Sequence, residues 1–253
     1  MSRSAPPDAF GRAAREYELG RPEWPEELID RVADGLELDR DATVLDLGAG
    51  TGKLTRALVG RFARVVAVEP DEAMREVLEE VVPAADARAG DAEAIPLRDD
   101  SVDAAFSGEA FHWFSTRKAV EEIARVLRPS GGLAVFWNIP VGEVEPPIGA
   151  EADALIEQAL DRGGAPGLPR VLSGAWREPF AGSPFGQLQE DELEREVVSD
   201  RESWLASLLS ISSIAAQPDE DRQELAGQLR ALIPAGRYRR RLRTVAYWTR
   251  LGV

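Results

Sequence analysis

The sequence predicts an α/β fold: a doubly wound, seven-stranded, mostly parallel sheet with an antiparallel closing hairpin and a helical lid. One observation is that short apolar, β-branched runs alternate with segments of helical periodicity between residues 43 and 137. Another is a strand, glycine turn and helix in direct succession at residues 43–62. The length of 253 residues, 44% of them hydrophobic, suits one domain of this kind with additions, or two small domains.

The first strand and the turn after it are the most informative stretch. Thr43 to Leu47 is an apolar run that predicts a buried strand, and Lys53 to Phe62 has helical spacing. Between them lie the alternate glycines Gly48, Gly50 and Gly52. Glycine lets the backbone approach a ligand closely, and the helix N-terminus offers free N–H groups, so this unit is typical of nucleotide binding.

The N-terminal part, residues 1–40, is expected to form cap or lid helices. Residues 10–19 can form a short helix, which Arg21-Pro22-Glu23-Trp24-Pro25 ends. Pro25 suits the first position of a second helix that ends near Gly35.

Residues 41–140 are expected to form the ligand-binding core, with further strands at 64–68, 86–89, 102–106 and 133–137. Asp71 can cap a helix over 72–82, and Ser115 or Thr116 a helix that runs to Leu127 and ends at residues 129–132. Residues 141–253 are expected to add pocket insertions and closing strands to the same sheet. They comprise a helix at 151–160, a loop at 163–185, a strand at 187–198, helices at 200–210 and 218–233, and a strand at 241–249.

Composition excludes several classes of protein. The absence of cysteine and the single histidine, His112, exclude thiolate and multi-histidine metal sites, so we expect no metal. No apolar run approaches the roughly 18 residues of a membrane span, and the N-terminus lacks a signal-peptide pattern. We therefore expect a cytoplasmic protein without a membrane partner.

The net charge of −15 makes nucleic acid an unfavourable partner. One local exception is residues 237–243, which hold five arginines. The run can be a solvated strand edge that balances acidic neighbours, or a patch for an anionic substrate or partner.

Polar side chains stand where four successive strands are expected to end: Asp46, Glu69, Asp91 and the segment 107–109. Ligands of open α/β sheets bind beyond the carboxyl ends of the strands. Glu69 lies 21 residues after Gly48, close to the offset of about 20 at which an acidic group meets a ribose. The spacing G-x-G-x-G differs from the G-x-G-x-x-G of dinucleotide enzymes, which leaves room for a different nucleoside.

These motifs together resemble class I S-adenosylmethionine-dependent methyltransferases: residues 46–52, Glu69 and Gly90-Asp91. Residues 108–114 and 127–132 are similar to the type 11 small-molecule branch, as is Tyr17 with the segment 21–25. The resemblance covers about residues 10–140 strongly. It implies a Rossmann-like fold, S-adenosylmethionine as cofactor and methyl transfer to a small-molecule acceptor. We expect a monomer or homodimer, which no motif decides.

The resemblance also implies roles for individual residues. Glu69 would hold the ribose diol, Asp46 would accept from the ammonium group, and Asp91 would accept from the adenine amino group. The full set implied for the cofactor is Tyr17, Arg21, Asp46, Gly48, Ala49, Gly50, Glu69, Pro70, Met74, Asp91, Ala92, Ser107 and Glu109. The branch pattern has Gln and Asp where this chain has Glu109 and Ser115, so Glu109 can stabilise the sulfonium or face a cationic acceptor.

His112 is the candidate general base, because its ordinary pKa suits proton transfer near neutral pH. Its aromatic neighbours also allow it to be only part of a pocket wall. The residues implied for the acceptor pocket are Trp113, Phe114, Trp137, Asn138, Ser210 and Ser213.

Three other functions remain open: a nicotinamide-dependent oxidoreductase, which the glycine spacing disfavours; a cofactor-binding protein without turnover; and a macromolecular methyltransferase. The acidic charge argues against an RNA substrate. Ser107-Gly108-Glu109-Ala110 stands where one nitrogen-methylating branch has an N-P-P-Y-type motif, which argues weakly against that branch.

Overall fold

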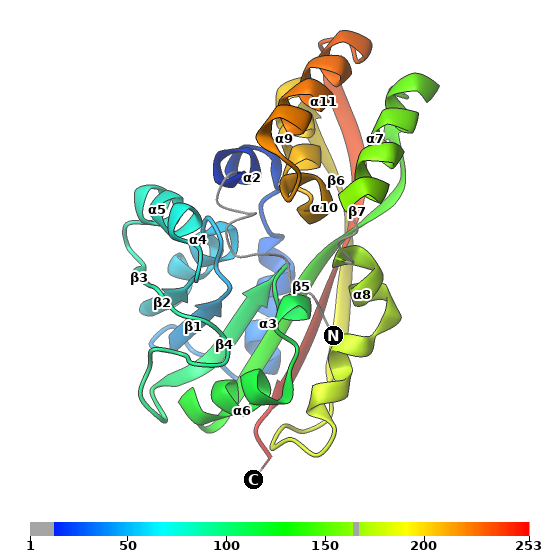
Figure 1. The fold of residues 1–253 in the computed structure, drawn as a ribbon. Coiled ribbons are helices and arrows are strands. Elements are labelled where there is room, and N and C mark those ends of the chain that lie inside the picture. The colour runs from blue at the N-terminus through cyan, green and yellow to red at the C-terminus, as the bar shows by residue number, and fades with distance from the viewer. Residues whose placement is uncertain (1–12, 164–166, 253) are drawn as a thin grey trace.

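The computed structural model describes residues 13–163 and 167–252. A seven-stranded sheet with the order β3-β2-β1-β4-β5-β7-β6 runs through it (Figure 1). β3, β2, β1, β4 and β5 are parallel, and β7 and β6 are antiparallel to their neighbours. The strands are β1 (Thr43–Leu47), β2 (Arg64–Val68), β3 (Asp86–Arg88), β4 (Val102–Gly108), β5 (Leu127–Glu145), β6 (Gln189–Asp200) and β7 (Arg237–Arg250). The predicted fold class is confirmed.

Helices cover both faces of the parallel part. One face packs against α3 (Glu26–Gly35), α4 (Lys53–Val59) and α5 (Glu72–Val81), the other against α6 (Arg117–Val126), α8 (Gly167–Ser173) and the 3-10 helix η2 (Ala175–Phe180). Side chains alternate between these two cores along each strand: Val44 faces the first and Leu45 the second. None of the helices described is long and apolar enough to cross a membrane.

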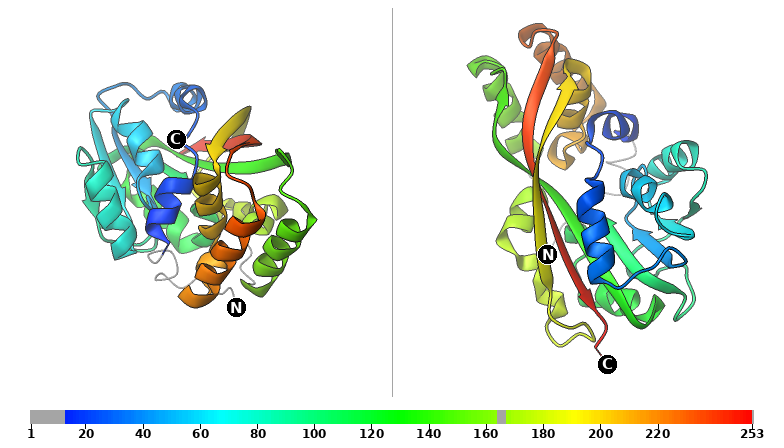
Figure 2. Two further views of the ribbon diagram at one scale, coloured as in Figure 1. Left: turned by 90° about the horizontal axis from the view of Figure 1, so that it is seen from above. Right: turned by 180° about the vertical axis from the view of Figure 1, so that it is seen from behind.

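The antiparallel strands reach beyond the parallel strands and carry a separate helical layer (Figures 1 and 2). This layer consists of α7 (Ala150–Gly163), α9 (Arg201–Leu209), α10 (Ser212–Ala215) and α11 (Asp219–Leu232). Its core is built around Trp204, Leu229 and Tyr238. The N-terminal helix α2 (Ala14–Gly20) lies between α5 and α9 and so bridges the two parts.

The structure differs from the sequence prediction in several places. The strand predicted at 133–137 already begins at Leu127, because that residue pairs with Val102 of β4 as soon as α6 ends. The predicted loop 163–185 contains α8 and η2, which bury Val171 and Trp176. β7 begins at Arg237, before the predicted start at 241, because Arg237 pairs with Asp200 at the end of β6. Part of the helix predicted at 10–19 lies outside the described residues.

Candidate functional site

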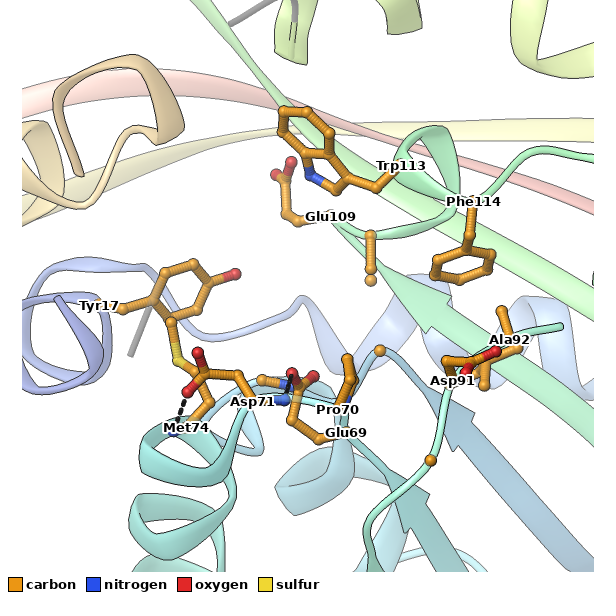
Figure 3. A pocket seen from close by; sticks show the side chains of 16 residues that line it. Tyr17, Glu69, Pro70, Asp71, Met74, Asp91, Ala92, Glu109, Trp113 and Phe114 are labelled. Atoms are coloured by element: carbon orange, nitrogen blue, oxygen red, sulfur yellow. Dashed lines mark hydrogen bonds between the residues drawn. The ribbon is translucent and has the colours of Figure 1, made fainter. Parts of the chain in front are cut away.

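A cavity of about 260 Å³ lies at the carboxyl ends of β1, β2 and β4, and we call it the sheet-edge cavity. Figure 3 shows Glu69, Pro70 and Asp71 on one side and Glu109, Trp113 and Phe114 on the opposite side. Its sequence-predicted lining residues are Tyr17, Gly48, Gly50, Glu69, Pro70, Met74, Asp91, Ala92, Glu109, Trp113 and Phe114. Five more were not predicted as site residues: Leu47, Asp71, Gly90, Gly108 and Ala110.

The glycine turn after β1 forms the floor of this cavity. Gly48 and Gly50 have φ values of +70° and +56°, in the region that side chains disfavour. A Cβ at Gly48 would lie 2.7 Å from the Cβ of Ala110, so that position has no room for a side chain. A Cβ at Gly50 would meet nothing within 4 Å, because this part of the turn faces open space.

Glu69 directly follows β2 and is only 8% exposed. Its Oε2 accepts a hydrogen bond from the Gly50 N–H at 2.8 Å, and its Oε1 accepts one from the Asp71 N–H at 3.0 Å. Burial raises the pKa of this carboxyl, and the two backbone donors oppose the rise. Each oxygen retains a second lone pair that can accept a hydrogen bond from a ligand in the cavity.

The walls beside Glu69 come from α2 and α5. Asp71 caps α5, because its Oδ1 accepts a hydrogen bond from the Met74 N–H at 2.9 Å. The ring of Tyr17 packs against the cluster around buried Met74. Burial raises the pKa of the Tyr17 hydroxyl to about 12, so the hydroxyl stays protonated.

Three residues implied for the cofactor lie behind the cavity wall rather than in it: Asp46, Ala49 and Ser107. Asp46 is fully buried; its Oδ2 accepts a hydrogen bond from the Thr55 hydroxyl at 2.6 Å, and its Oδ1 has no partner among the described residues. Burial raises the pKa of Asp46 to about 7.

A second cavity of about 290 Å³ adjoins the first, and we call it the hairpin cavity because β5 and β7 form part of its wall. Tyr17 and Glu109 line both cavities. The other lining residues are mostly apolar: Arg21, Pro22, Trp24, Lys53, Asn138, Pro140, Val144, Ile148, Asp153, Ile156, Trp204, Ser207, Leu208, Ile211, Arg240 and Leu242.

Glu109 stands at the junction of the two cavities with a φ of +55°, a strained value for a residue with a side chain. Two hydrogen bonds hold it there. Its N–H donates to the Phe136 carbonyl at 2.9 Å, and its Oε1 accepts from the Asn138 N–H at 2.7 Å. Burial raises the pKa of Glu109, while the nearby Arg21 opposes the rise.

The residues implied for catalysis and the acceptor pocket separate in the structure. Asn138 lines the hairpin cavity, as does Arg21, which the sequence assigned to the cofactor. Trp113 and Phe114, assigned to the acceptor, line the sheet-edge cavity instead. Four lie outside the lining of both cavities: His112, Trp137, Ser210 and Ser213.

His112 is 4% exposed, and its Nδ1 accepts a hydrogen bond from the Trp137 indole N–H at 3.0 Å. Burial lowers the pKa of His112 to about 3. This geometry favours the interpretation of His112 as part of a packed wall. No group of His, Asp or Glu side chains suited to a metal ion occurs among residues 13–163 and 167–252.

The hairpin-cavity residues that sequence reasoning missed come from elements far apart in the chain. Ile156, Trp204 and Leu242 carry no local signal for this role, whereas Trp24 belongs to the segment 21–25, which carries part of the family resemblance. Arg240 also has a local sequence signal, because it belongs to the arginine run at 237–243.

A mostly parallel sheet with a glycine turn after β1 and an acidic residue after β2, open to a cavity at that edge, is the arrangement of doubly wound α/β proteins, whose ligands bind beyond the carboxyl ends of the strands. A family model described as "Methyltransferase domain" matches residues 45–135. An uncharacterized methyltransferase of Schizosaccharomyces pombe is 34% identical over 219 residues, 86% of this chain and 84% of that protein. The chain therefore belongs to the S-adenosylmethionine-dependent methyltransferases.

Two further similarities agree with this family. An uncharacterized methyltransferase of Mycobacterium tuberculosis is 48% identical over 130 residues, 51% of this chain and 52% of that protein. A solved structure from Anaeromyxobacter dehalogenans, described as a candidate type II methyltransferase, matches with a TM-score of 0.64 and 27% identity, covering 91% of this chain and 97% of that one.

Proposed function

We propose that this enzyme transfers the methyl group of S-adenosylmethionine to a small-molecule acceptor by in-line displacement, with the cofactor in the sheet-edge cavity and the acceptor in the hairpin cavity. The observation that supports this most is that the two cavities meet at Tyr17 and Glu109. Ligands that fill both cavities would therefore face one another at these two side chains.

The residues of the sheet-edge cavity fit this cofactor. The Glu69 carboxylate has lone pairs left for a ribose diol, and the open face of Gly50 admits close approach of a ligand to the backbone. Asp91 and Ala92 line the same cavity, where we propose that they meet the adenine. Asp46 lies behind the cavity wall, and its Oδ1 lacks a partner among the described residues, so we propose that a water links this oxygen to the ligand ammonium.

When bound, S-adenosylmethionine supplies an electrophilic methyl group on a sulfonium. The chain must then align the acceptor with this methyl group and keep water out. Tyr17, Trp113 and Phe114 would form the water-excluding wall around the junction. Glu109 is the best placed group to take a proton from an acceptor, because it is a carboxylate at the junction whose pKa is raised by burial.

Replacement of Glu69 tests the cofactor site. We expect Glu69→Ala to weaken binding of S-adenosylhomocysteine by roughly 1.5–3 kcal/mol, the scale of a charge-assisted hydrogen bond. Isothermal titration calorimetry gives the affinity, and urea unfolding shows whether the variant is folded. Glu79→Ala, at an exposed position of α5, is the matched control and should bind as the wild type does.

An unchanged affinity in Glu69→Ala would refute the ribose role of Glu69. Tight binding of NAD with no affinity for S-adenosylhomocysteine would instead indicate an oxidoreductase. Tight S-adenosylhomocysteine binding without turnover of any acceptor in a broad metabolite screen would indicate a binding protein.

A further inference from the structure

Two arginine side chains meet in the wall of the hairpin cavity. Arg21 donates from Nε to the Ser210 Oγ at 3.0 Å and from Nη2 to the Ser210 carbonyl at 3.2 Å. Arg240 donates from Nη1 to the Ser207 Oγ at 2.7 Å. The Ser210 Oγ in turn donates to the Ser207 carbonyl at 2.8 Å. Ser207 at the end of α9 and Ser210 directly after it therefore bind both guanidinium groups. We call Arg21, Ser207, Ser210 and Arg240 the arginine–serine cluster.

The cluster is short of negative charge. Among the described residues neither Arg21 nor Arg240 forms an ion pair, and the buried Nε of Arg240 has no hydrogen-bond acceptor. Serine oxygens orient a guanidinium but carry no charge. The pKa of Arg240 is lowered to about 10, first by burial and then by the charge of Arg21, so the two cations are near enough to repel each other.

The other ionisable groups of the hairpin cavity leave this charge only partly balanced. The negative charge of Glu109 offsets the positive charge of Arg21. The two groups are close enough to interact, because Arg21 opposes the rise that burial causes in the pKa of Glu109. Lys53 and Arg56 share the carboxylates of Glu18 and Glu23, so the charges of these four side chains cancel. Asp153 lies exposed in the first turn of α7, where water screens its charge. About one positive charge remains for a ligand.

Strand geometry shows that Arg240 differs from its neighbours in the arginine run. Successive side chains of β7 point to opposite sides of the sheet. Arg239 is exposed and pairs with Glu196 at 3.1 Å, and Arg243 pairs with Glu192 at 3.7 Å. Tyr238, Arg240 and Leu242 alternate with them, and Arg240 and Leu242 line the cavity. Arg239 and Arg243 on one side of β7 thus pair with acidic residues of β6, whereas Arg240 on the other side places a positive charge in the wall of the hairpin cavity.

We infer that the methyl acceptor is an amphipathic carboxylic acid whose carboxylate lies between Arg21 and Arg240 while its apolar body fills the hairpin cavity. This inference rests on the proposed function, since it names the acceptor of that reaction. Planar guanidinium groups match a carboxylate with paired hydrogen bonds. A monoanion fits the single uncompensated charge, and the walls formed by Ile148, Ile156 and Trp204 fit an apolar body.

The test uses the whole protein saturated with S-adenosylhomocysteine, whose own binding is first measured by calorimetry. Short-chain to medium-chain alkanoic acids and arylalkanoic acids are titrated beside the amide, the amine and the phosphate monoester of the same carbon skeleton. We expect the acids to bind and the amides and amines not to bind. We expect Arg240→Gln to weaken acid binding by about tenfold to a hundredfold, the range for a lost charge-assisted hydrogen bond. Arg239→Gln, on the opposite side of β7, is the matched control and should bind as the wild type does.

Arg240→Lys provides a second readout if Arg240→Gln unfolds, because it keeps the charge and should retain part of the affinity. Equal binding of acids and amides, tighter binding of phosphate monoesters or amines, or full acid affinity in Arg240→Gln would each overturn the inference. A protein that binds S-adenosylhomocysteine but none of the acids overturns the inference alone. A protein that does not bind S-adenosylhomocysteine contradicts the proposed function.

Discussion

His112 shows why the type of a residue is weak evidence for its role. It is the single histidine of the chain and lies in an aromatic segment beside the site, which makes it an obvious base. Folding buries it and directs its Nδ1 to the Trp137 indole N–H. A histidine with a pKa of about 3 stays neutral at physiological pH and holds a proton poorly. We therefore propose a structural role for His112, with Glu109 as the better placed proton acceptor.

Replacement of His112 separates these roles through the pH dependence of stability. The pKa of His112 falls from 6.5 to about 3 on folding, so the folded state binds fewer protons than the unfolded state between these values. His112 makes its full contribution to the free energy of unfolding above pH 6.5. This contribution decreases as the pH falls toward 3, by at most roughly 1.4 kcal/mol per pH unit. His112→Gln should remove this dependence, measured by urea unfolding from pH 7 to pH 4.

The same variant should keep most of its turnover, because glutamine can still accept from the Trp137 indole. Wild-type protein at each pH is the reference. A loss of turnover much larger than the loss of S-adenosylhomocysteine affinity would restore the base role of His112.

Gly48, Gly50 and Glu69 of the sheet-edge cavity could be predicted from sequence because one local βαβ unit brings them together. Gly48 and Gly50 lie in one turn, and Glu69 follows the adjacent strand, so their proximity needs only the parallel pairing of β1 and β2. Arg21 and Arg240 are more than two hundred residues apart. Their meeting depends on how α2, α9 and β7 pack, and no periodicity in the sequence encodes that packing.

At the scale of elements, the bounds of β1 and β2 in the parallel half of the sheet agree with the prediction. In the antiparallel half the strands β6 and β7 were predicted, but with different bounds. Apolar runs such as 43–47 and 64–68 match β1 and β2 residue for residue, since strands buried on both faces are continuously apolar. β6 is charged along most of its length because one of its faces meets solvent. Residues 163–185 looked like loop because Gly and Pro are frequent, yet Trp176 packs on Trp137 with ring centroids 4.7 Å apart and fixes η2 to the sheet.

The docking of α2 on α9 can be tested at Gly20. A Cβ at this position would overlap the backbone of Ala206 and Ser207, which cannot move aside as a flexible side chain can. We expect Gly20→Ala to lower the free energy of unfolding by about 1–3 kcal/mol and to weaken acceptor binding, because Arg21 is the next residue and binds Ser210. Urea unfolding and calorimetry measure both effects.

Gly227→Ala is the matched control within α11, since a Cβ there meets nothing within 4 Å. It should leave stability unchanged or raise it by about 0.5–1 kcal/mol, because alanine favours a helix interior over glycine. A Gly20→Ala protein as stable as the wild type would show that α2 does not pack on α9 as described.

At the scale of the whole molecule, an acidic surface surrounds a site that holds the partly buried cations Arg21 and Arg240. The chain has 45 acidic and 30 basic residues, which gives a net charge of −15. Many of the ion pairs join exposed side chains, such as Arg15–Glu80 with side chains 79% and 63% exposed. Pairs of this kind contribute about 0–1 kcal/mol each and often nothing measurable. Unpaired carboxylates repel one another over the whole surface. We expect this repulsion to destabilise the fold by more than the exposed ion pairs together stabilise it.

Salt should therefore stabilise this protein. Between about 10 mM and 150 mM ionic strength the Debye length falls from roughly 30 Å to 8 Å, which screens repulsion across the molecule more than attraction within a close pair. We expect the free energy of unfolding near neutral pH to rise by on the order of 1 kcal/mol over this range of sodium chloride and then to level off. Urea unfolding at each salt concentration measures it, and an unchanged urea dependence excludes a change in the unfolded state. Sucrose, which adds no ions, is the control for general solute effects. A decrease in stability with salt would mean that the surface ion pairs outweigh the net repulsion.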